Sequence, residues 1–172
     1  MLRLFIREKT GIKIETVEDT SKPAEKKENI LWVDLFIPTE EEIKWVEENF
    51  HIEFPSKQEM EEIEISSRYW EDEETITINA YFLIKEDENV FNETVTFILK
   101  GHTLITIRYR DLRTFREMVN RLLTNPRYYE DGYYIIAGIM EIRIDTDADT
   151  LEFITKEISK LSKIVFTGID IT

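Results

Sequence analysis

The feature that most constrains the fold is a heptad pattern near the C-terminal end of the chain. Between residues 133 and 165, apolar side chains recur at alternating spacings of four and three, with Asp147 as one polar member. This spacing predicts an α-helix with a continuous apolar seam that needs a facing helix to cover it. At 1.5 Å per residue such a helix is about 50 Å long, and Gly168 is placed to end it. The seam consists of Tyr133, Ala137, Met140, Ile144, Asp147, Leu151, Ile154, Ile158, Leu161 and Val165.

A helix of this length is too long to be covered by a domain of the size that precedes it. The sequence up to Thr172 contains no second helix of comparable length, so we expect the facing helix to come from another segment or another subunit. The alternative is that the helix packs on its own domain along its first half and frays beyond it. Either way, the pattern divides the chain into a sandwich domain over residues 1–128 and a long helix over residues 129–167.

The first 128 residues combine strand patterns with helix patterns. The sequence Thr39–Glu42 is a capping box that begins one helix, and Ser56 with Glu59 repeats this signal for a second helix. A polar turn is expected at 85–92. The sequence predicts an α+β fold, an α/β/α sandwich whose mixed β-sheet is flanked by helices and followed by the long C-terminal helix. Strands are expected at 2–6, 12–17, 30–37, 75–84, 94–100 and 103–109, with a third helix at 111–123.

Charge and composition exclude several classes of function. The net charge of −14 would repel a phosphate backbone or an anionic membrane surface, so nucleic acid is not an expected partner. The chain has no cysteine and two histidines, which argues against zinc or copper sites built on thiolate or imidazole. No stretch approaches the length of apolar residues that spans a bilayer, and the N-terminus does not have the pattern of a signal peptide. We therefore expect a soluble, cytosolic chain.

The acidic residues are concentrated in one segment. Residues 40–74 hold fourteen acidic and three basic side chains, a net charge of −11. Within this band, Glu61 and Glu62 lie early in the second expected helix, and grouped carboxylates suit a hydrated Mg²⁺ ion. Consecutive helical residues do not share a face, so the pair could serve only a hydrated ion or an ion shared with a neighbouring chain. The alternative is an acidic helix face that is simply solvated.

One further acidic motif is excluded as a metal site. Residues 145–149, Asp-Thr-Asp-Ala-Asp, resemble the start of an EF-hand loop, but Thr150 stands where that loop needs glycine and Lys156 where it needs glutamate. The sequence also has no phosphate-binding glycine-rich loop and no nucleophile motif around Ser66 and Ser67. We expect no enzymatic activity.

Several short motifs, taken in order, resemble the CorA magnesium/cobalt transporter family of the proteobacterial type. The resemblance covers nearly the whole chain, and it is the order and spacing of the pieces that make it specific. The matching residues are Trp32-Val33-Asp34-Leu35 with Pro38, Met60-Glu61-Glu62-Ile63-Glu64, Ser67-Arg68-Tyr69-Trp70-Glu71-Asp72, Thr94-Val95-Thr96-Phe97, Leu104-Ile105-Thr106-Ile107-Arg108, and Ala148-Asp149 with Glu152, Ile154, Leu161-Ser162 and Val165.

The resemblance implies a cytosolic regulatory domain of a divalent-cation channel on the inner face of the plasma membrane. Such domains form a homopentamer and hold regulatory Mg²⁺, or Co²⁺ in its place, between subunits. On the family pattern, Glu61 and Glu62 match an acidic pair of this site. A third acid falls at Gly138, and Glu141 is the nearest carboxylate. The family's pore signature, Gly-Met-Asn, and its transmembrane helices are absent, so the chain resembles a piece cut before the membrane-spanning segment.

Two functions of different kinds follow from these expectations. The first is the Mg²⁺-sensing domain of a CorA-type channel. The second is a stand-alone acidic module that associates through the seam and needs no ion. The sequence does not determine which of Mg²⁺, Co²⁺ and Ni²⁺ is the physiological ion. It also does not determine which oligomer the 172 residues form by themselves.

Overall fold

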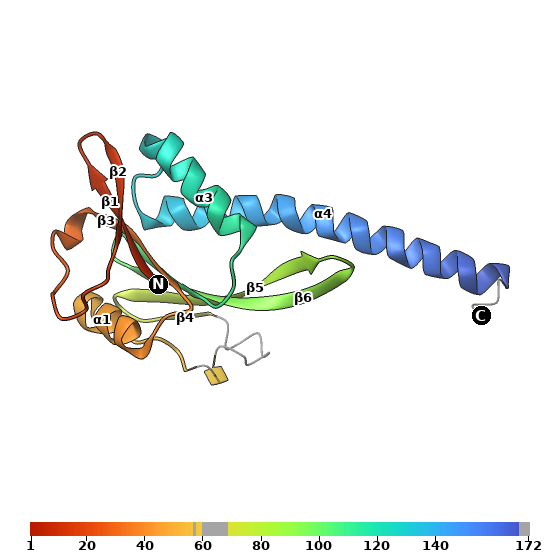
Figure 1. The fold of residues 1–172 in the computed structure, drawn as a ribbon, viewed down its shortest axis with the longest axis horizontal. Coiled ribbons are helices and arrows are strands. Elements are labelled where there is room, and N and C mark those ends of the chain that lie inside the picture. The colour runs from red at the N-terminus through yellow and green to blue at the C-terminus, as the bar shows by residue number, and fades with distance from the viewer. Residues whose placement is uncertain (57, 60–68, 169–172) are drawn as a thin grey trace.

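The computed structural model describes residues 1–56, 58–59 and 69–168 of the chain (Figure 1). The fold is a seven-stranded sheet with helices on both faces and a long helix that continues past the sheet. The strands are β1 (Leu2–Glu8), β2 (Gly11–Thr16), β3 (Ile30–Phe36), β4 (Tyr69–Glu71), β5 (Thr75–Glu86), β6 (Asn89–Lys100) and β7 (Thr103–Arg108). The helices are α1 (Glu40–Phe50), α3 (Arg113–Thr124) and α4 (Gly132–Thr167), with short 3₁₀ turns η1 (Lys27–Asn29) and η3 (Pro126–Tyr128).

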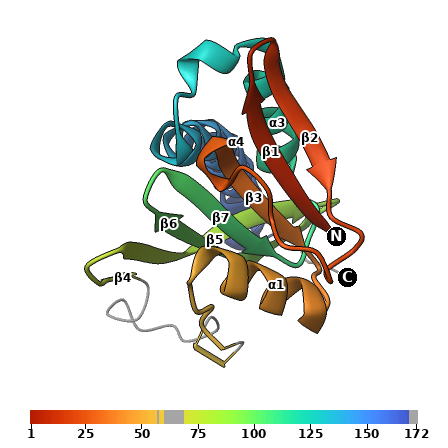
Figure 2. The ribbon, with the colours of Figure 1, turned by 90° about the vertical axis from the view of Figure 1, so that its left-hand side faces the viewer.

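The sheet is mixed, as the sequence predicted. Its strand order is β2-β1-β3-β7-β6-β5-β4, and every neighbouring pair is antiparallel except β3 and β7 (Figure 2). In that parallel pair Trp32 lies opposite Leu104 and Leu35 opposite Ile107. β3 is buried along nearly its whole length, which explains its almost continuous apolar sequence. The α/β/α sandwich is therefore confirmed.

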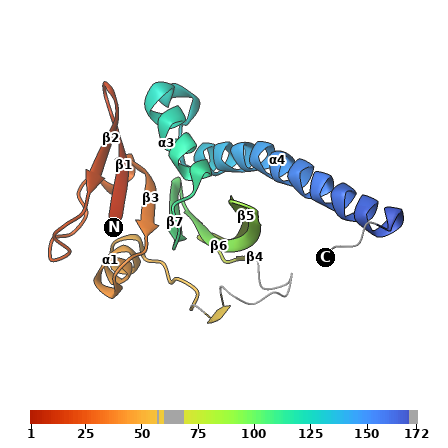
Figure 3. The same cartoon turned by 45° about the vertical axis from the view of Figure 1, so that its right-hand side comes forward.

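Each face of the sheet has its own apolar core. On one face α3 and the first half of α4 pack over a core that includes Trp32, Phe97 and Phe115. On the other face α1 packs over a second core that includes Leu35, Val46 and Ile105. Figure 3 shows α1 on the side of the sheet opposite to α3 and α4. The division matters for the site, because residues on α4 and residues that follow α1 lie on different sides of the sheet.

The helix-capping signals are confirmed where they fall in described residues. The Thr39 hydroxyl accepts a hydrogen bond from the Glu42 backbone N–H at 3.2 Å, and the Glu42 carboxylate accepts one from the Thr39 N–H at 3.0 Å. In the second signal, the Glu59 N–H donates to the Ser56 hydroxyl at 3.2 Å. The rest of the second predicted helix lies outside the described residues.

The turn predicted at 85–92 is present but shorter than predicted. β5 and β6 continue through it as one hairpin, with Lys85 opposite Val90 and the chain reversing at Asp87 and Glu88. Asp87 has a φ of 54°, in the left-handed region that a tight reversal needs. Polarity misled the prediction, because residues 85–89 at the tip of the hairpin are all polar and exposed. We call the outer part of this hairpin, residues 82–93, the arm.

A buried ion network fixes the centre of the sheet. Asp34 on β3 is fully buried and pairs in bidentate fashion with Arg108 on β7, at 2.9 and 3.2 Å. Arg3 donates to the same carboxylate at 3.0 Å, and the Thr106 hydroxyl donates to it at 2.9 Å. The Trp32 indole N–H in turn donates to Thr106 at 3.0 Å. Because its oxygens are all used, this carboxylate serves the fold and is not free to bind a ligand.

Candidate functional site

The long helix α4 presents two different faces. One face packs on its own domain through Ile135, Ile139 and Ile142, which are at most 1% exposed. The heptad seam lies on a different face, where Met140 is partly buried against the core but Ile144 is 68% exposed and Ile158 is 61% exposed. Leu151, Leu161 and Val165 are also exposed. The prediction that the seam requires a facing helix agrees with this geometry, since the described part of the chain leaves most of the seam from Ile144 onward exposed.

The alternative expectation for α4 was correct for its first half only. The helix does pack on the domain there, but it continues without interruption to Thr167, where Gly168 at φ 65° caps it. Figure 1 shows this second half running past the sheet and beyond the arm. A solvated apolar helix of this length is marginal alone, which favours a missing partner.

Two contacts rest α4 on the arm, and a third interaction lies within α4 itself. The Lys85 ammonium lies 3.7 Å from the centroid of the Phe153 ring. The Arg143 guanidinium lies 4.9 Å from the Phe82 ring and donates from Nε to Asp147 at 3.3 Å. The single polar member of the seam is therefore neutralised within its own helix, so burial of the seam would not leave an unpaired carboxylate at that position.

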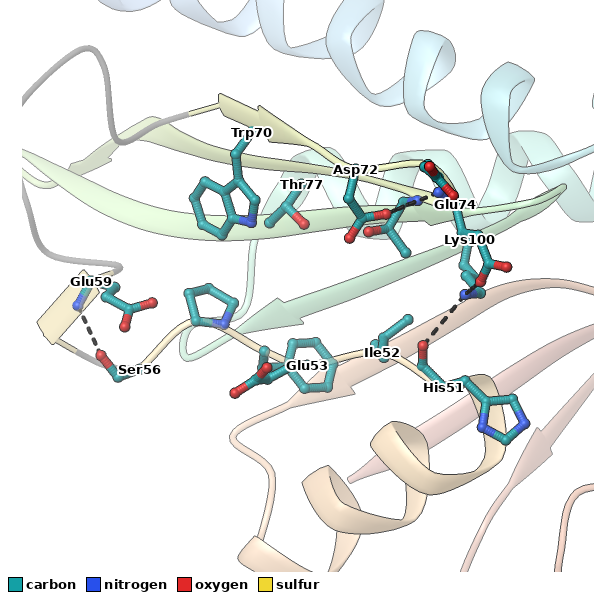
Figure 4. Close-up of a pocket in the computed structure, with 14 residues that line it drawn as sticks. His51, Ile52, Glu53, Ser56, Glu59, Trp70, Asp72, Glu74, Thr77 and Lys100 are labelled. Atoms are coloured by element: carbon teal, nitrogen blue, oxygen red, sulfur yellow. Dashed lines mark hydrogen bonds and ion pairs between the residues drawn. The ribbon is translucent and has the colours of Figure 1, made fainter.

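A hollow lined by described residues lies on the opposite side of the sheet. It has a volume of about 890 Å³ and lies between the segment after α1 and the β4–β5 end of the sheet (Figure 4). Its walls carry five carboxylates and one lysine, Lys100. The lining consists of His51, Ile52, Glu53, Phe54, Pro55, Ser56, Glu59, Trp70, Asp72, Glu73, Glu74, Thr75, Thr77 and Lys100. We call it the acidic hollow.

Two of these carboxylates are held in place. Asp72 accepts the backbone N–H groups of Glu74 and Thr75, each at 2.9 Å, and these hydrogen bonds lower the pKa of its carboxyl. Glu74 pairs with the ammonium of Lys100, and that hydrogen bond lowers the pKa of Glu74. Lys100 also donates to the carbonyl of His51 at 3.4 Å (Figure 4). Both carboxylates are therefore ionised at neutral pH.

The residues predicted to bind Mg²⁺ are not brought together by the described structure. Glu61 and Glu62 lie outside the described residues. Glu141 is exposed on α4 and makes no hydrogen bond or ion pair with any described residue. α4, which carries Glu141, packs on the face of the sheet opposite to α1 (Figure 3). Among the described residues, no three acidic or histidine side chains lie close enough to hold a metal ion together.

Gly138, where the resemblance places a third acid, lies in a close contact. A Cβ atom on Gly138 would lie 2.8 Å from the Met118 sulfur and 3.0 Å from the Tyr129 ring, because α3 and α4 cross closely at this point. A carboxylate would have no room and no partner in that contact. Glu141, one turn further along, is the first acid on α4 that reaches solvent.

The sequence predicted the concentration of acidic residues in this region but not the hollow that they line. His51, Trp70, Thr77 and Lys100 come from four separate segments, and no spacing rule connects them. The available signal was the dense run of acids between 40 and 74, opposed by so few bases.

With this geometry in view, comparison with known proteins decides the family. A family model described as CorA-like Mg²⁺ transporter protein matches residues 27–170. The chain belongs to that family. The expected resemblance to CorA is thus confirmed.

Curated relatives agree with this assignment. The magnesium transport protein CorA of Wolinella succinogenes is 40% identical over 96% of the chain, and that of Campylobacter jejuni strain RM1221 is 41% identical over 94%. The CorA protein of Salmonella typhimurium is 28% identical over 98%. The chain spans about half the length of these CorA relatives, 53%, 52% and 52% respectively.

Solved CorA structures share the fold. The soluble domain of CorA from Methanocaldococcus jannaschii matches 81% of the chain with a TM-score of 0.64 and 19% identity, and covers 57% of that structure's chain. The complete CorA magnesium transporter of the same organism matches 99% of the chain with a TM-score of 0.69 and 16% identity, and covers 53% of its chain. Within the described residues, no helix combines the length and apolar character needed to cross a bilayer.

Proposed function

We propose that this chain is the Mg²⁺-sensing regulatory domain of a CorA-type magnesium/cobalt channel, acting on the cytoplasmic side of the plasma membrane as part of a homopentamer. The observation that carries the proposal is the uncovered seam of α4 in a chain that matches about half of each CorA relative. The other half of such a protein supplies the pore. The role proposed here is regulatory and not enzymatic.

The physical basis is repulsion between acidic surfaces. The band at 40–74 has a net charge of −11, and a second acidic surface placed against it would be pushed away. Divalent cations between subunits offset that repulsion and favour the closed arrangement. When the ions leave, the subunits separate and the seam-bearing helices move with them.

The residues proposed to hold the ion are Glu61, Glu62 and Glu141. Glu141 fits the requirement for Mg²⁺, which uses one or two carboxylates and keeps most of its waters, because its carboxylate is exposed and has no partner among the described residues. Co²⁺ is expected to take the place of Mg²⁺. The proposed ion joins two subunits, as the resemblance to the family implies.

The test is thermal unfolding of the chain in MgCl₂ and in NaCl of equal ionic strength. At ten times the dissociation constant, binding stabilises the fold by about 1.4 kcal/mol, which raises the melting temperature by about 3–6 °C for a chain of this size. Substituting both Glu61→Gln and Glu62→Gln should remove the Mg²⁺-specific part. The matched control is Glu40→Gln with Glu41→Gln, an adjacent exposed pair in α1. An unchanged Mg²⁺ effect in the first double variant would refute this site.

The exposed seam also supports a second function, a stand-alone module that associates through α4 without any ion. It predicts self-association in EDTA, which sedimentation velocity measures directly. A monomer in EDTA that associates only with Mg²⁺ would exclude it.

A further inference from the structure

The acidic hollow has an aromatic wall that a magnesium site does not need. Trp70 is 37% exposed and lines the hollow together with Phe54. Figure 4 shows its ring on the same side as Thr77 and across from the Ile52–Ser56 segment. A hydrated Mg²⁺ ion gains little from an indole face, because its charge lies behind a shell of water. An alkylammonium group gains both apolar contact and attraction to the ring.

The carboxylates around this wall are in excess of the bases. Glu74 is neutralised by Lys100, which leaves Glu53, Glu59, Asp72 and Glu73. None of these four forms an ion pair with a described residue. They are too dispersed for three of them to hold one metal ion. Their arrangement suits a cation whose charge is spread over several centres.

Thr77 gives an independent indication of a ligand. Its side chain is on β5, only 3% of the residue is exposed, and it lines the hollow. Figure 4 shows it directed into the hollow between Trp70 and Asp72. Its hydroxyl has no hydrogen-bond partner among the described residues. Among the described residues, the buried side-chain atoms without a partner are Arg3 Nε and Asn79 Nδ2, so the Thr77 oxygen is reached from the hollow, where an ammonium group could donate to it.

Lys100 shows how the hollow binds an ammonium group. Its Nζ is held by the Glu74 carboxylate and by the His51 carbonyl, and its side chain is 20% exposed. One end of the hollow is thus already occupied by a tethered amine. The rest of the hollow offers the same types of group, carboxylates and a neutral oxygen acceptor, without a protein amine to fill them.

We propose that the acidic hollow binds a linear organic polycation of the polyamine class. The alkyl segments lie along Trp70 and Phe54, and the ammonium groups pair with Glu53, Asp72 and Glu73 while one donates to Thr77. This would be a second cation-binding function of the domain, with ligands other than Glu61, Glu62 and Glu141, and it would make the domain responsive to organic cations.

Tryptophan fluorescence provides a direct test with spermidine as the probe. Of the three tryptophans, Trp32 is fully buried and Trp45 is 5% exposed, so a ligand in the hollow reports mainly through Trp70. A saturable change with spermidine is expected, and MgCl₂ at equal ionic strength should not reverse it. If MgCl₂ completely reverses the fluorescence change that spermidine produces, the hollow binds cations through general charge attraction, and the proposal fails.

Two variants with opposite expected effects make the test specific. Glu73→Gln should weaken spermidine binding by about 2- to 5-fold, the size of one exposed charge pair. Lys100→Met releases Glu74 and should strengthen binding by a similar factor. Trp70→Leu should also weaken spermidine binding by about 2- to 5-fold. For this variant, binding is measured by the spermidine-dependent rise in melting temperature.

The matched control is Glu141→Gln, the same chemical change on the opposite side of the sheet. It should leave spermidine binding unchanged, whereas the Mg²⁺ proposal predicts that it weakens the Mg²⁺ effect. The two proposals can therefore fail separately. Equal weakening by Glu73→Gln and Glu141→Gln would show that only net charge matters and would overturn the polyamine site.

Discussion

Gly132→Ala should detach the start of α4 from the sheet. Gly132 is the first residue of the helix, and its N–H donates to the His102 carbonyl at 2.7 Å. A Cβ atom at this position would lie 2.4 Å from the Leu104 backbone nitrogen and 2.8 Å from the Thr103 carbonyl carbon. Both are backbone atoms of β7, so no side-chain rotation relieves the contact.

The expected loss of stability follows from these distances. Overpacking of a tight contact costs about 1–3 kcal/mol, and loss of the Gly132–His102 hydrogen bond about 0.5–1.5 kcal/mol. Together they amount to about 2–4 kcal/mol. For a chain of this size, that lowers the melting temperature by about 4–16 °C. Gly138→Ala is a matched comparison, because its new Cβ meets the Met118 sulfur at 2.8 Å, the middle of a flexible side chain that can move.

The assay is thermal unfolding followed by far-ultraviolet circular dichroism for both variants. Alanine also favours a helix over glycine by up to about 1 kcal/mol, which offsets part of the cost at Gly138 in the helix interior. Gly132→Ala should therefore be clearly the less stable of the two. If Gly132→Ala melts at or above the temperature of Gly138→Ala, the close docking of α4 on β7 does not hold as described.

Three further predictions concern the core, the seam and the acid side of the pH range. Asp34→Ala should lower the free energy of unfolding by about 3–5 kcal/mol in urea denaturation, because it leaves a buried guanidinium unpaired; a loss below 1 kcal/mol would mean that the network is dispensable. Ile158→Ser on the seam should change stability by no more than about 0.5 kcal/mol, whereas Ile139→Ala on the packed face should cost about 2–5 kcal/mol, and similar losses would contradict the assignment of the two faces. The pair of Glu74 and Lys100 stabilises the fold above the ordinary glutamate pKa and loses this effect as the pH falls through the lowered pKa of Glu74, so the melting temperatures of wild type and Lys100→Met should differ at neutral pH and converge in acid.

Local signals predicted most elements of the fold. Three such signals each depend on a few neighbouring residues and can therefore be read from the sequence alone: the capping box at Thr39, the alternation in β5 and the heptad of α4. The outer part of the arm was missed because residues 85–89 are all polar and exposed, which removes the alternation that marks a strand. Its strands are held by pairing and by Arg110, which bonds Glu86 and Glu93 across the hairpin.

The site was predicted only in part, for a different physical reason. The acidic band is a property of composition, and it was visible without a structure. The hollow arises where the segment after α1 passes the β4–β5 end of the sheet, a meeting of elements that no local pattern encodes. The same holds for Gly138, where the close crossing of α3 and α4 excludes a side chain that an alignment would expect.

The parallel pairing of β3 with β7 has a consequence for synthesis of the protein. Trp32 finds its partner strand only when Leu104 has been made, and at 5–20 residues per second the intervening segment takes about 4–15 s to translate. During that interval β3, the most apolar strand of the domain, has an unpaired edge, which is a template for aggregation. Synonymous codons that slow translation between β3 and β7 should therefore lower the soluble yield of this domain, whereas slowing after Arg108 should not.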